Sequence, residues 1–148
     1  MSGLFDYGRQ LFLEGDIAWL TDTIRVMLVD HATYTPNLAT DQFFDDITLA
    51  ARYGNTGDTP GTPGERSDCP ALGSKTSTDG VADAADTTFT APTGSVPLAS
   101  LVVFKDTGSG ATSPLICHLD SGTGLPITPN GGPITAAWSS GGNGIFKL

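Results

Sequence analysis

The sequence predicts a mainly β (all-β class) domain: an antiparallel β-sandwich or jelly-roll-like fold with a short N-terminal helix and a long Gly/Pro-rich loop. Nineteen Gly and ten Pro in 148 residues indicate frequent turns, and only 16% of the residues are charged. Short apolar runs rich in β-branched residues lie between these turns. A chain of this length can bury a core without disulfides or metals, so we expect a single β domain over residues 1–148.

An amphipathic helix is predicted over roughly residues 3–14. Apolar side chains recur there at near-helical spacing, and Gly15 is a stop signal. Gly8 weakens the helix by roughly 1 kcal/mol relative to Ala. If residues 1–15 dock on the domain, these side chains are core; if they form an arm, they contact a partner. The partner-interface hypothesis selects Leu4, Phe5, Tyr7, Arg9 and Phe12.

Two elements are expected in the next thirty residues. The run IRVMLV at residues 24–29 is apolar except for one Arg and rich in β-branched residues, which predicts a strand buried on at least one face. Thr40 is then a candidate N-cap, followed by acidic residues. This pattern predicts a helix of one or two turns that carries Phe43, Phe44 and Ile47.

Residues 54–73 predict the long surface loop. Eight of these twenty positions are Gly or Pro, and no apolar periodicity survives. Loops of this length are uncommon in compact domains and are either functional or disordered. Two interpretations therefore stay open, a partner-contacting loop and a mobile one.

From Gly80 onward the pattern is regular, with short β-prone runs between Gly-rich turns, as in a meander or Greek key. The runs are DTTFTA, LASLVVFKD, SPLICHLD, GPITAAW and GIFKL. The second and third flank the turn TGSGAT and are predicted to pair as a hairpin. The last is predicted to be a closing strand that fixes the C-terminus in a sheet.

Two acidic turns resemble the loops on which aspartic peptidases carry their paired carboxylates. They are Asp-Thr-Gly at 106–108 and Asp-Ser-Gly at 120–122. If the hairpin brought both to one end of the sheet, the two groups could share a proton. The peptidase hypothesis is disfavoured because charged Lys105 stands where that family has an apolar residue, and its charge opposes proton sharing. We expect both motifs to act as turns.

The remaining candidates predict neither a catalytic residue nor a metal ligand. His31 follows a strand and is interpreted as a turn residue, whereas strand alternation predicts that His118 faces solvent. Asp79, Asp83 and Asp86 miss the spacing of a calcium loop. Nucleophile-elbow, phosphate-binding and dinucleotide-binding motifs are also absent. We therefore expect no enzyme activity and no cofactor.

Charge and cysteine usage limit the partners. A net charge of −9 opposes binding to nucleic acid and suits an acidic surface that resists aggregation or docks on a basic protein. Cys69 and Cys117 are expected to be free thiols. No apolar run is long enough to cross a membrane, and no leader precedes the first element. These features predict that the protein stays in the cytosol where it is made and binds no membrane.

Two stretches resemble small virion structural proteins of tailed bacteriophages. They are GLFDYGRQLFLEGDIAWLTDTIRVMLVD and LVVFKDTGSGATSPLICHLDSGTGLPITPNGG, the latter with the closing IFKL. The likeness covers residues 2–50 and 79–148, including GVADAADTTF. It implies a non-enzymatic component of the virion, a capsid decoration or cement protein. The loop at 54–73 and the segment TAAWSSGGNG depart from the family pattern.

The resemblance also implies where such a protein acts. It would be made in the host bacterial cytoplasm and bind at the capsid surface between major capsid protein subunits, or to other virion proteins, as a homo-oligomer with a trimer favoured. Two alternatives stay open: a neck or tail structural component, and a host-surface or carbohydrate-binding module. For the latter, Trp138 beside SSGGNG is the best candidate, although a Trp at a strand end is more often core.

Overall fold

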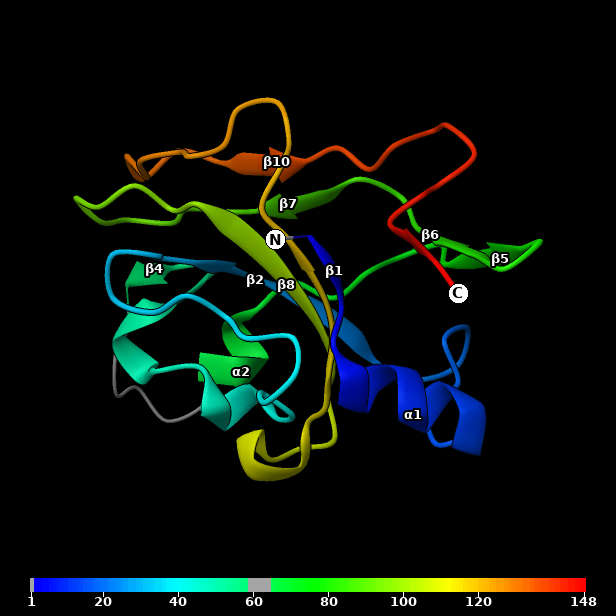
Figure 1. The fold of residues 1–148 in the computed structure, drawn as a ribbon. Coiled ribbons are helices and arrows are strands. Elements are labelled where there is room, and N and C mark those ends of the chain that lie inside the picture. The colour runs from blue at the N-terminus through cyan, green and yellow to red at the C-terminus, as the bar shows by residue number, and fades with distance from the viewer. Residues whose placement is uncertain (1, 59–64) are drawn as a thin grey trace.

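The computed structural model describes residues 2–58 and 65–148, and the fold is mainly β and antiparallel, as the sequence predicts. Within these residues six strands form the main sheet, in the order β1-β9-β8-β2-β3-β4 (Figure 1). The strands are Gly3–Leu4 (β1), Ile24–Val29 (β2), Arg52–Gly54 (β3), Gly57–Asp58 (β4), Ser100–Lys105 (β8) and Leu115–Leu119 (β9).

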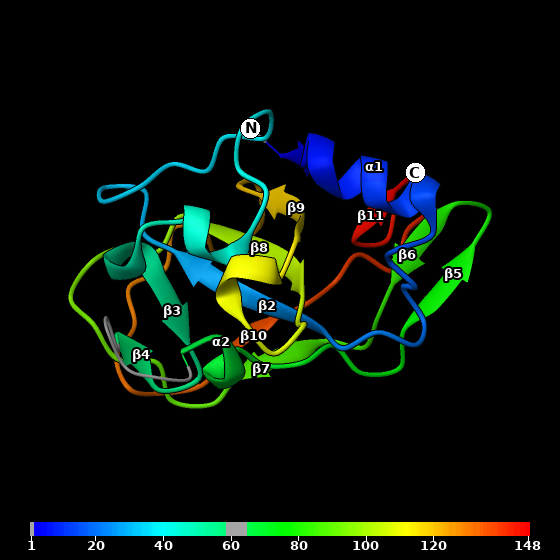
Figure 2. The same cartoon turned by 90° about the horizontal axis from the view of Figure 1, so that it is seen from below.

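Two smaller antiparallel sheets complete the fold of the described residues. One pairs β7 with β10, and the other has the order β11-β6-β5. Their strands are Thr76–Thr78 (β5), Val81–Asp83 (β6), Thr87–Phe89 (β7), Ile134–Ala136 (β10) and Phe146–Lys147 (β11). The β7/β10 ribbon lies above the main sheet in Figure 1. Figure 2 shows the fold from below, with the short helices in front of the main sheet. This layering is consistent with an antiparallel sandwich, because the β7/β10 ribbon lies over one face of the main sheet.

The central pair of the main sheet is β2 and β8, and it confirms the strand predicted at residues 24–29. All six residues of β2 pair with β8, from Ile24 opposite Lys105 to Val29 opposite Ser100. Alternate side chains enter two cores: Val26 lies in a cluster on one face, and Met27 lies in a cluster on the other. Both faces of β2 are covered, which explains why its sequence is an almost continuous apolar run.

The N-terminal helix is shorter than predicted. α1 spans Asp6–Glu14, and the two residues of β1 pair with His118 and Cys117 of β9 instead of joining the helix. Gly15 ends α1 in the left-handed conformation, at φ 80°, which a glycine adopts without steric cost.

Gly8 has a packing role that the sequence did not reveal. A Cβ built at Gly8 would lie 2.6 Å from the Leu115 carbonyl oxygen and 3.2 Å from the Ile116 Cα. Only a glycine lets α1 approach β9 this closely. The residue that weakens the helix by its propensity therefore permits the helix to dock.

The helix predicted after Thr40 is a 3-10 turn, η1, at Phe44–Asp46. Thr40 is not its N-cap. The Asp46 carboxylate instead accepts the backbone N–H groups of Gln42 and Phe43, at 2.7 and 2.8 Å. The predicted apolar residues do reach the core at Phe44 and Ile47, which are both buried, whereas the preceding Phe43 packs edge-on against the ring of Tyr7.

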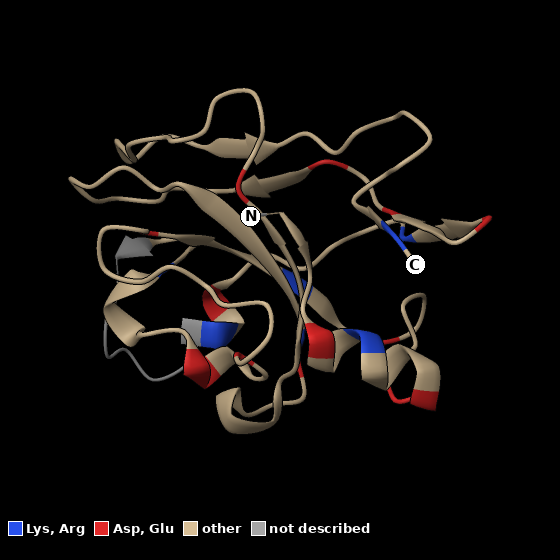
Figure 3. Ribbon diagram, in the orientation of Figure 1, with Lys and Arg blue, Asp and Glu red and all other residues tan. Residues whose placement is uncertain are grey.

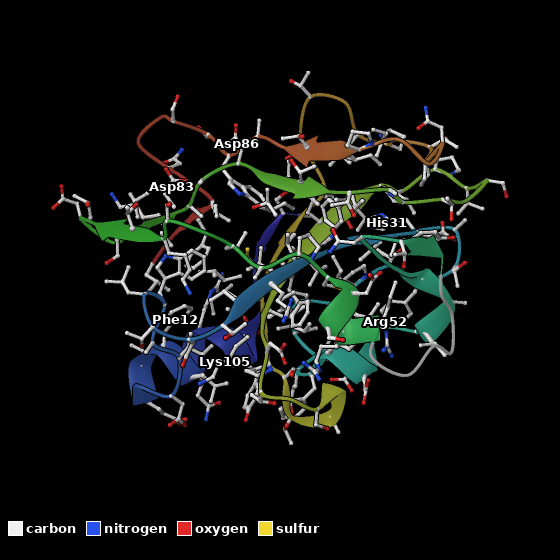
Figure 4. All side chains as sticks on the ribbon, turned by 180° about the vertical axis from the view of Figure 1, so that it is seen from behind. Phe12, His31, Arg52, Asp83, Asp86 and Lys105 are labelled. Carbon is white, nitrogen blue, oxygen red and sulfur yellow. The ribbon has the colours of Figure 1, made fainter. Side chains whose placement is uncertain are left out.

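A second 3-10 turn, η2 (Leu49–Ala51), leads into β3, where Arg52 is buried. Its guanidinium lies 4.5 Å from the centre of the Phe44 ring, donates to the Ile47 carbonyl oxygen at 2.6 Å and pairs with Asp45 at 3.2 Å. These partners satisfy a charge that would otherwise be costly to bury. Figure 4 shows Arg52 beside the strands of the main sheet, near α2.

The predicted loop at 54–73 is not a single loop. It contains the end of β3, strand β4 and a short helix, α2, at Glu65–Asp68, and residues 59–64 lie outside the described part of the chain. Asp68 accepts hydrogen bonds from the backbone N–H and hydroxyl of Thr56, at 3.1 and 2.9 Å. These contacts, between residues distant in sequence, were invisible to a composition argument.

The two predictions for the C-terminal half are confirmed. β8 and β9 form the expected hairpin, with a bulge where Val103 pairs with Cys117 but Phe104 pairs with Leu115. The turn between them contains a 3-10 segment, η3, at Gly110–Thr112. β11 is the expected closing strand, although it joins β6 and not the main sheet. No helix in the described residues is both long and apolar enough to cross a bilayer.

Candidate functional site

Asp106 and Asp120 lie at opposite ends of the β8/β9 hairpin. Asp106 follows β8 at the turn, whereas Asp120 follows β9, whose last residue Leu119 pairs with Leu101 at the start of β8. About five residues of strand therefore separate them, or roughly 16 Å at the rise of a β-strand. The sequence argument that the hairpin could bring both carboxylates to one end of the sheet was wrong, because antiparallel strands leave a hairpin at opposite ends.

Asp106 joins three segments of the chain. Its carboxylate, only 9% exposed, accepts from Arg25 of β2 at 2.7 Å and pairs with Arg66 of α2. It also accepts the Gly108 N–H at 2.9 Å, as expected for an acidic turn. Arg25 in turn donates to the Cys69 carbonyl oxygen at 2.7 Å. The Asp-Thr-Gly motif thus anchors α2 to the sheet.

Lys105 pairs with a carboxylate other than its neighbour in sequence. Its ammonium lies 2.9 Å from Asp22 and donates to the Asp16 carbonyl oxygen at 2.6 Å. Partial burial alone would raise the pKa of Asp22, but the hydrogen bonds from Lys105 and the Ala18 N–H outweigh it and lower that pKa. Lys105 therefore fixes the segment between α1 and β2, and Figure 4 shows it beside α1.

The five residues of the partner-interface hypothesis divide between core and surface. Phe5 is fully buried and Leu4 is 8% exposed, so the core alternative describes both residues in this fold. Tyr7 and Phe12 are half-buried, and the Phe12 ring lies 5.8 Å from that of Phe146. Arg9 is exposed and pairs with Asp6 at 3.5 Å. A partner that meets the docked helix would therefore touch its other face, where Leu13 is 91% exposed.

His118 is buried, contrary to the prediction that it faces solvent. It is 1% exposed, and its strand lies inside the sheet, paired with β1 at Gly3 and with β8 at Val102. The alternation argument placed it correctly on the face opposite Cys117. It could not reveal that both faces of this sheet are covered.

The two histidines of the chain meet at one edge of the main sheet. His31 Nε2 and His118 Nε2 are 3.4 Å apart, and the ring centres are 5.4 Å apart. His31 Nε2 also lies 2.7 Å from the hydroxyl of buried Ser100. Burial lowers the pKa of His31, and the nearby carboxylates of Asp120 and Asp30 act in the opposite direction. Figure 4 marks His31 at the end of β2.

Sequence reasoning missed this pair. Its register explains the meeting: Val29 pairs with Ser100, and Leu101 pairs with Leu119, so the residues that follow β2 and β9 converge at one edge. One local signal existed, because His118 and Asp120 are two residues apart and so project on the same side of an extended strand. The pairing of β2 with β8, which brings in His31, had no local signal.

A cleft of about 670 Å³ lies between the main sheet and the β7/β10 ribbon. Apolar side chains from both layers line it: Leu28, Phe89, Leu101, Leu119, Ile134 and Trp138. Hydroxyls line it too, among them those of Ser121, Thr123 and Ser139, and its lining in the described residues includes no charged side chain. This volume falls within the range of small-molecule sites.

Trp138 is half-buried against the core that extends under the ribbon. Its indole N–H donates to the Thr87 hydroxyl at 3.1 Å, and its backbone N–H donates to the Asp86 carboxylate at 3.0 Å. The ring is therefore held in place as a wall of the cleft. It satisfies both sequence interpretations in part, since it packs on the core and still borders an open space.

The three aspartates of the weak calcium pattern act separately. Asp79 has a left-handed φ of 53° in the β5/β6 turn, Asp83 accepts the N–H of Ala84, and Asp86 accepts that of Trp138. Figure 4 labels Asp83 and Asp86 on the stretch that leads into β7. In the described part of the chain, no three or more His, Cys, Asp or Glu side chains are grouped so that they could hold a metal.

Charge is unevenly distributed over the fold. Residues 87–104 and 121–146 contain no Asp, Glu, Lys or Arg. Apart from β8, these residues form the β7/β10 ribbon and its connecting segments, which we call the uncharged layer (residues 87–99 and 121–145). Figure 3 shows this layer in tan, with the charged residues elsewhere on the ribbon.

Comparison of the chain with models of known protein families gives no match. Comparison with curated proteins gives none either.

Proposed function

We propose that this chain is a non-enzymatic structural protein of a tailed-bacteriophage virion, a capsid decoration protein that binds between major capsid protein subunits. The proposal starts from the resemblance carried by residues 2–50 and 79–148. It includes self-association as a trimer and a final location at the capsid surface. The strand pairing described above supports it, since a rigid antiparallel scaffold suits work done by contact area.

The observation that carries the proposal is the uncharged layer. The chain has sixteen acidic and seven basic residues, and none of them lies in residues 87–104 or 121–146. The cores of protein interfaces are depleted in charged residues, because an ion loses its hydration when it is buried. A layer of Gly, Ser, Thr and apolar residues is the part of this surface that a partner can cover at the lowest desolvation cost.

The acidic remainder of the surface has a complementary role in this proposal. A net charge of −9 keeps free copies apart before assembly and disfavours contact with packaged DNA. The docking face is then the uncharged layer, and the acidic elements, including α1, point away from the shell. This differs from the interface first expected at α1, two of whose five residues are core.

The test uses particles purified from an infection in which the chain is supplied as wild type or as a variant. Thr135 is an exposed residue of β10, and Thr135→Asp places a charge in the uncharged layer. Thr78 is an exposed residue of β5, so Thr78→Asp is the matched control at a strand outside the layer. The copy number per shell subunit is measured by quantitative mass spectrometry.

We expect Thr135→Asp to reduce the copy number at least tenfold, while Thr78→Asp and Leu13→Glu incorporate normally. Loss with Leu13→Glu alone would move the docking face to α1. Absence of the wild-type chain from particles would refute the proposal. Electron microscopy of labelled particles then separates the capsid surface from the neck or tail, and light scattering of the free protein tests the trimer.

The cleft beside Trp138 favours a second candidate, a host-surface or carbohydrate-binding module. An aromatic wall with hydroxyl groups around it and no charged lining suits a neutral sugar, which stacks its apolar face on an aromatic ring. A glycan array with wild type and Trp138→Ala tests this candidate. Binding that the variant loses would support it, and a blank array would remove it.

A further inference from the structure

We propose that His31 and His118 together bind one divalent transition-metal ion of the zinc class, through their two Nε2 atoms. The proposal rests on the meeting of these two side chains at the edge of the main sheet and is independent of the proposed virion function. Neither residue has a metal role on the sequence pattern alone, because the two lie 87 positions apart.

The distance between the two nitrogens fits shared coordination. Zinc binds imidazole nitrogen at about 2.0–2.1 Å in tetrahedral geometry, which places two ligand atoms about 3.3–3.4 Å apart. The observed separation of His31 Nε2 and His118 Nε2 is 3.4 Å. A hydrogen bond to nitrogen is normally shorter, about 2.7–3.2 Å, so the pair is better spaced for a common ion than for a bond to each other.

The site is held by the sheet. His118 is fixed in β9 between β1 and β8, and His31 directly follows Asp30 at the end of β2. His31 is half-exposed, which leaves an approach from solvent. The hydroxyl of Ser100, 2.7 Å from the same His31 nitrogen, gives up this hydrogen bond when the ion binds.

Charges of both signs act on the pair: the N-terminal amino group opposes a bound cation, whereas two carboxylates favour one. The carboxylates of Asp120 and Asp30 are both close enough to act electrostatically on His31. Asp120 accepts the Ser2 hydroxyl at 2.7 Å, and Asp30 accepts the Thr33 hydroxyl at 2.6 Å, so both are oriented by hydrogen bonds. In this proposal the two carboxylates attract the ion through their charge without binding it, and water completes the coordination.

The composition of the chain makes the test sharp, because it contains two His in total. The full-length protein is titrated with zinc chloride in a calorimeter, and its thermal unfolding is followed with and without the ion. We expect one ion per chain and a raised melting temperature, since the ion binds the folded state in preference to the unfolded one.

His31→Gln is the main variant, because the half-exposed position tolerates glutamine and the amide can still bond to Ser100. We expect it to abolish calorimetric binding and the thermal shift. Asp120→Asn removes one of the two carboxylate charges that act on His31 and should weaken binding. Asp83→Asn, a carboxylate on β6, is the control and should bind like wild type.

His118 is buried, so its replacement risks the fold, and the wild-type protein supplies the second measurement. Zinc at saturation should change the chemical shifts of the ring protons of both imidazoles in a nuclear magnetic resonance spectrum. The proposal is overturned if wild type binds no zinc at millimolar concentration, if His31→Gln binds as well as wild type, or if bound zinc leaves either imidazole unshifted.

Discussion

Gly8→Ala separates the packing role of Gly8 from its helix propensity, because the two predict changes of opposite sign. On propensity alone, Ala stabilises a helix interior by about 1 kcal/mol relative to Gly. In this fold the added Cβ would lie 2.6 Å from the Leu115 carbonyl oxygen, inside van der Waals contact with backbone that cannot rotate away. α1 cannot withdraw either, since the Phe5 N–H preceding it donates to the Ile116 carbonyl oxygen at 3.0 Å.

The magnitude follows from these two terms. Overpacking a rigid contact costs about 1–3 kcal/mol, and the upper part of that range applies where the obstacle is backbone. After the gain in propensity is subtracted, we expect Gly8→Ala to lower the free energy of unfolding by about 1–2 kcal/mol. For a domain of this size, that lowers the melting temperature by about 2–8 °C.

The assay is urea unfolding followed by circular dichroism, with Leu13→Ala as the control on the same helix. Leu13 is 91% exposed and Leu and Ala are both good helix formers, so the control should change the unfolding midpoint little. The reasoning is refuted if Gly8→Ala raises the midpoint by the amount that propensity predicts. That result would mean that α1 does not touch β9 at this position.

Three further predictions concern stability. Asp106→Asn should destabilise the protein by about 3 kcal/mol in urea unfolding, because it leaves two partly buried arginines without their carboxylate. A change below about 0.5 kcal/mol, which is the size of an ordinary surface substitution, would contradict this prediction. Burial, together with the hydrogen bond to Asp41, raises the pKa of Tyr34 from 10.0 to about 12. The contribution of protonated Tyr34 to the stability of the folded protein is therefore complete below pH 10 and is lost as the pH rises toward 12. Tyr34→Phe should therefore show a shallower loss of stability over that interval, and an unchanged slope would count against the bond. Cys69 and Cys117 are buried and form no disulfide, and burial raises the pKa of the Cys117 thiol. Both should therefore react with a thiol reagent only at the rate of unfolding, and fast labelling of the native protein would show that the core opens locally.

The elements that could be predicted from the sequence are those with a strong local pattern. The continuous apolar run at 24–29 became β2, the two β-prone runs around TGSGAT became the β8/β9 hairpin, and GIFKL became the closing strand. The elements that failed depended on partners elsewhere. Thr40 lost its capping role to Asp46, and residues 3–4 became a strand because the edge of β9 was open to pairing.

The candidate sites divide in the same way. The acidic turn at Asp106 was recognised as a turn, since an Asp that bonds two residues onward is a local event. The error on Asp106 and Asp120 was one of strand direction, and the error on His118 was one of burial. Neither strand order nor the covering of a sheet face has a period that a sequence displays.

By itself, the sequence determined the fold class, the turns, the closing strand and the acidity of the protein, because backbone preference, hydrophobic alternation and charge are properties of short stretches. Only the tertiary structure decided that Gly8 is a contact point, that the uncharged segments gather in one layer, and that His31 and His118 stand 3.4 Å apart. These three facts depend on which strands pair and in what register. Pairing is chosen by the burial free energy of the whole core, to which every distant segment contributes.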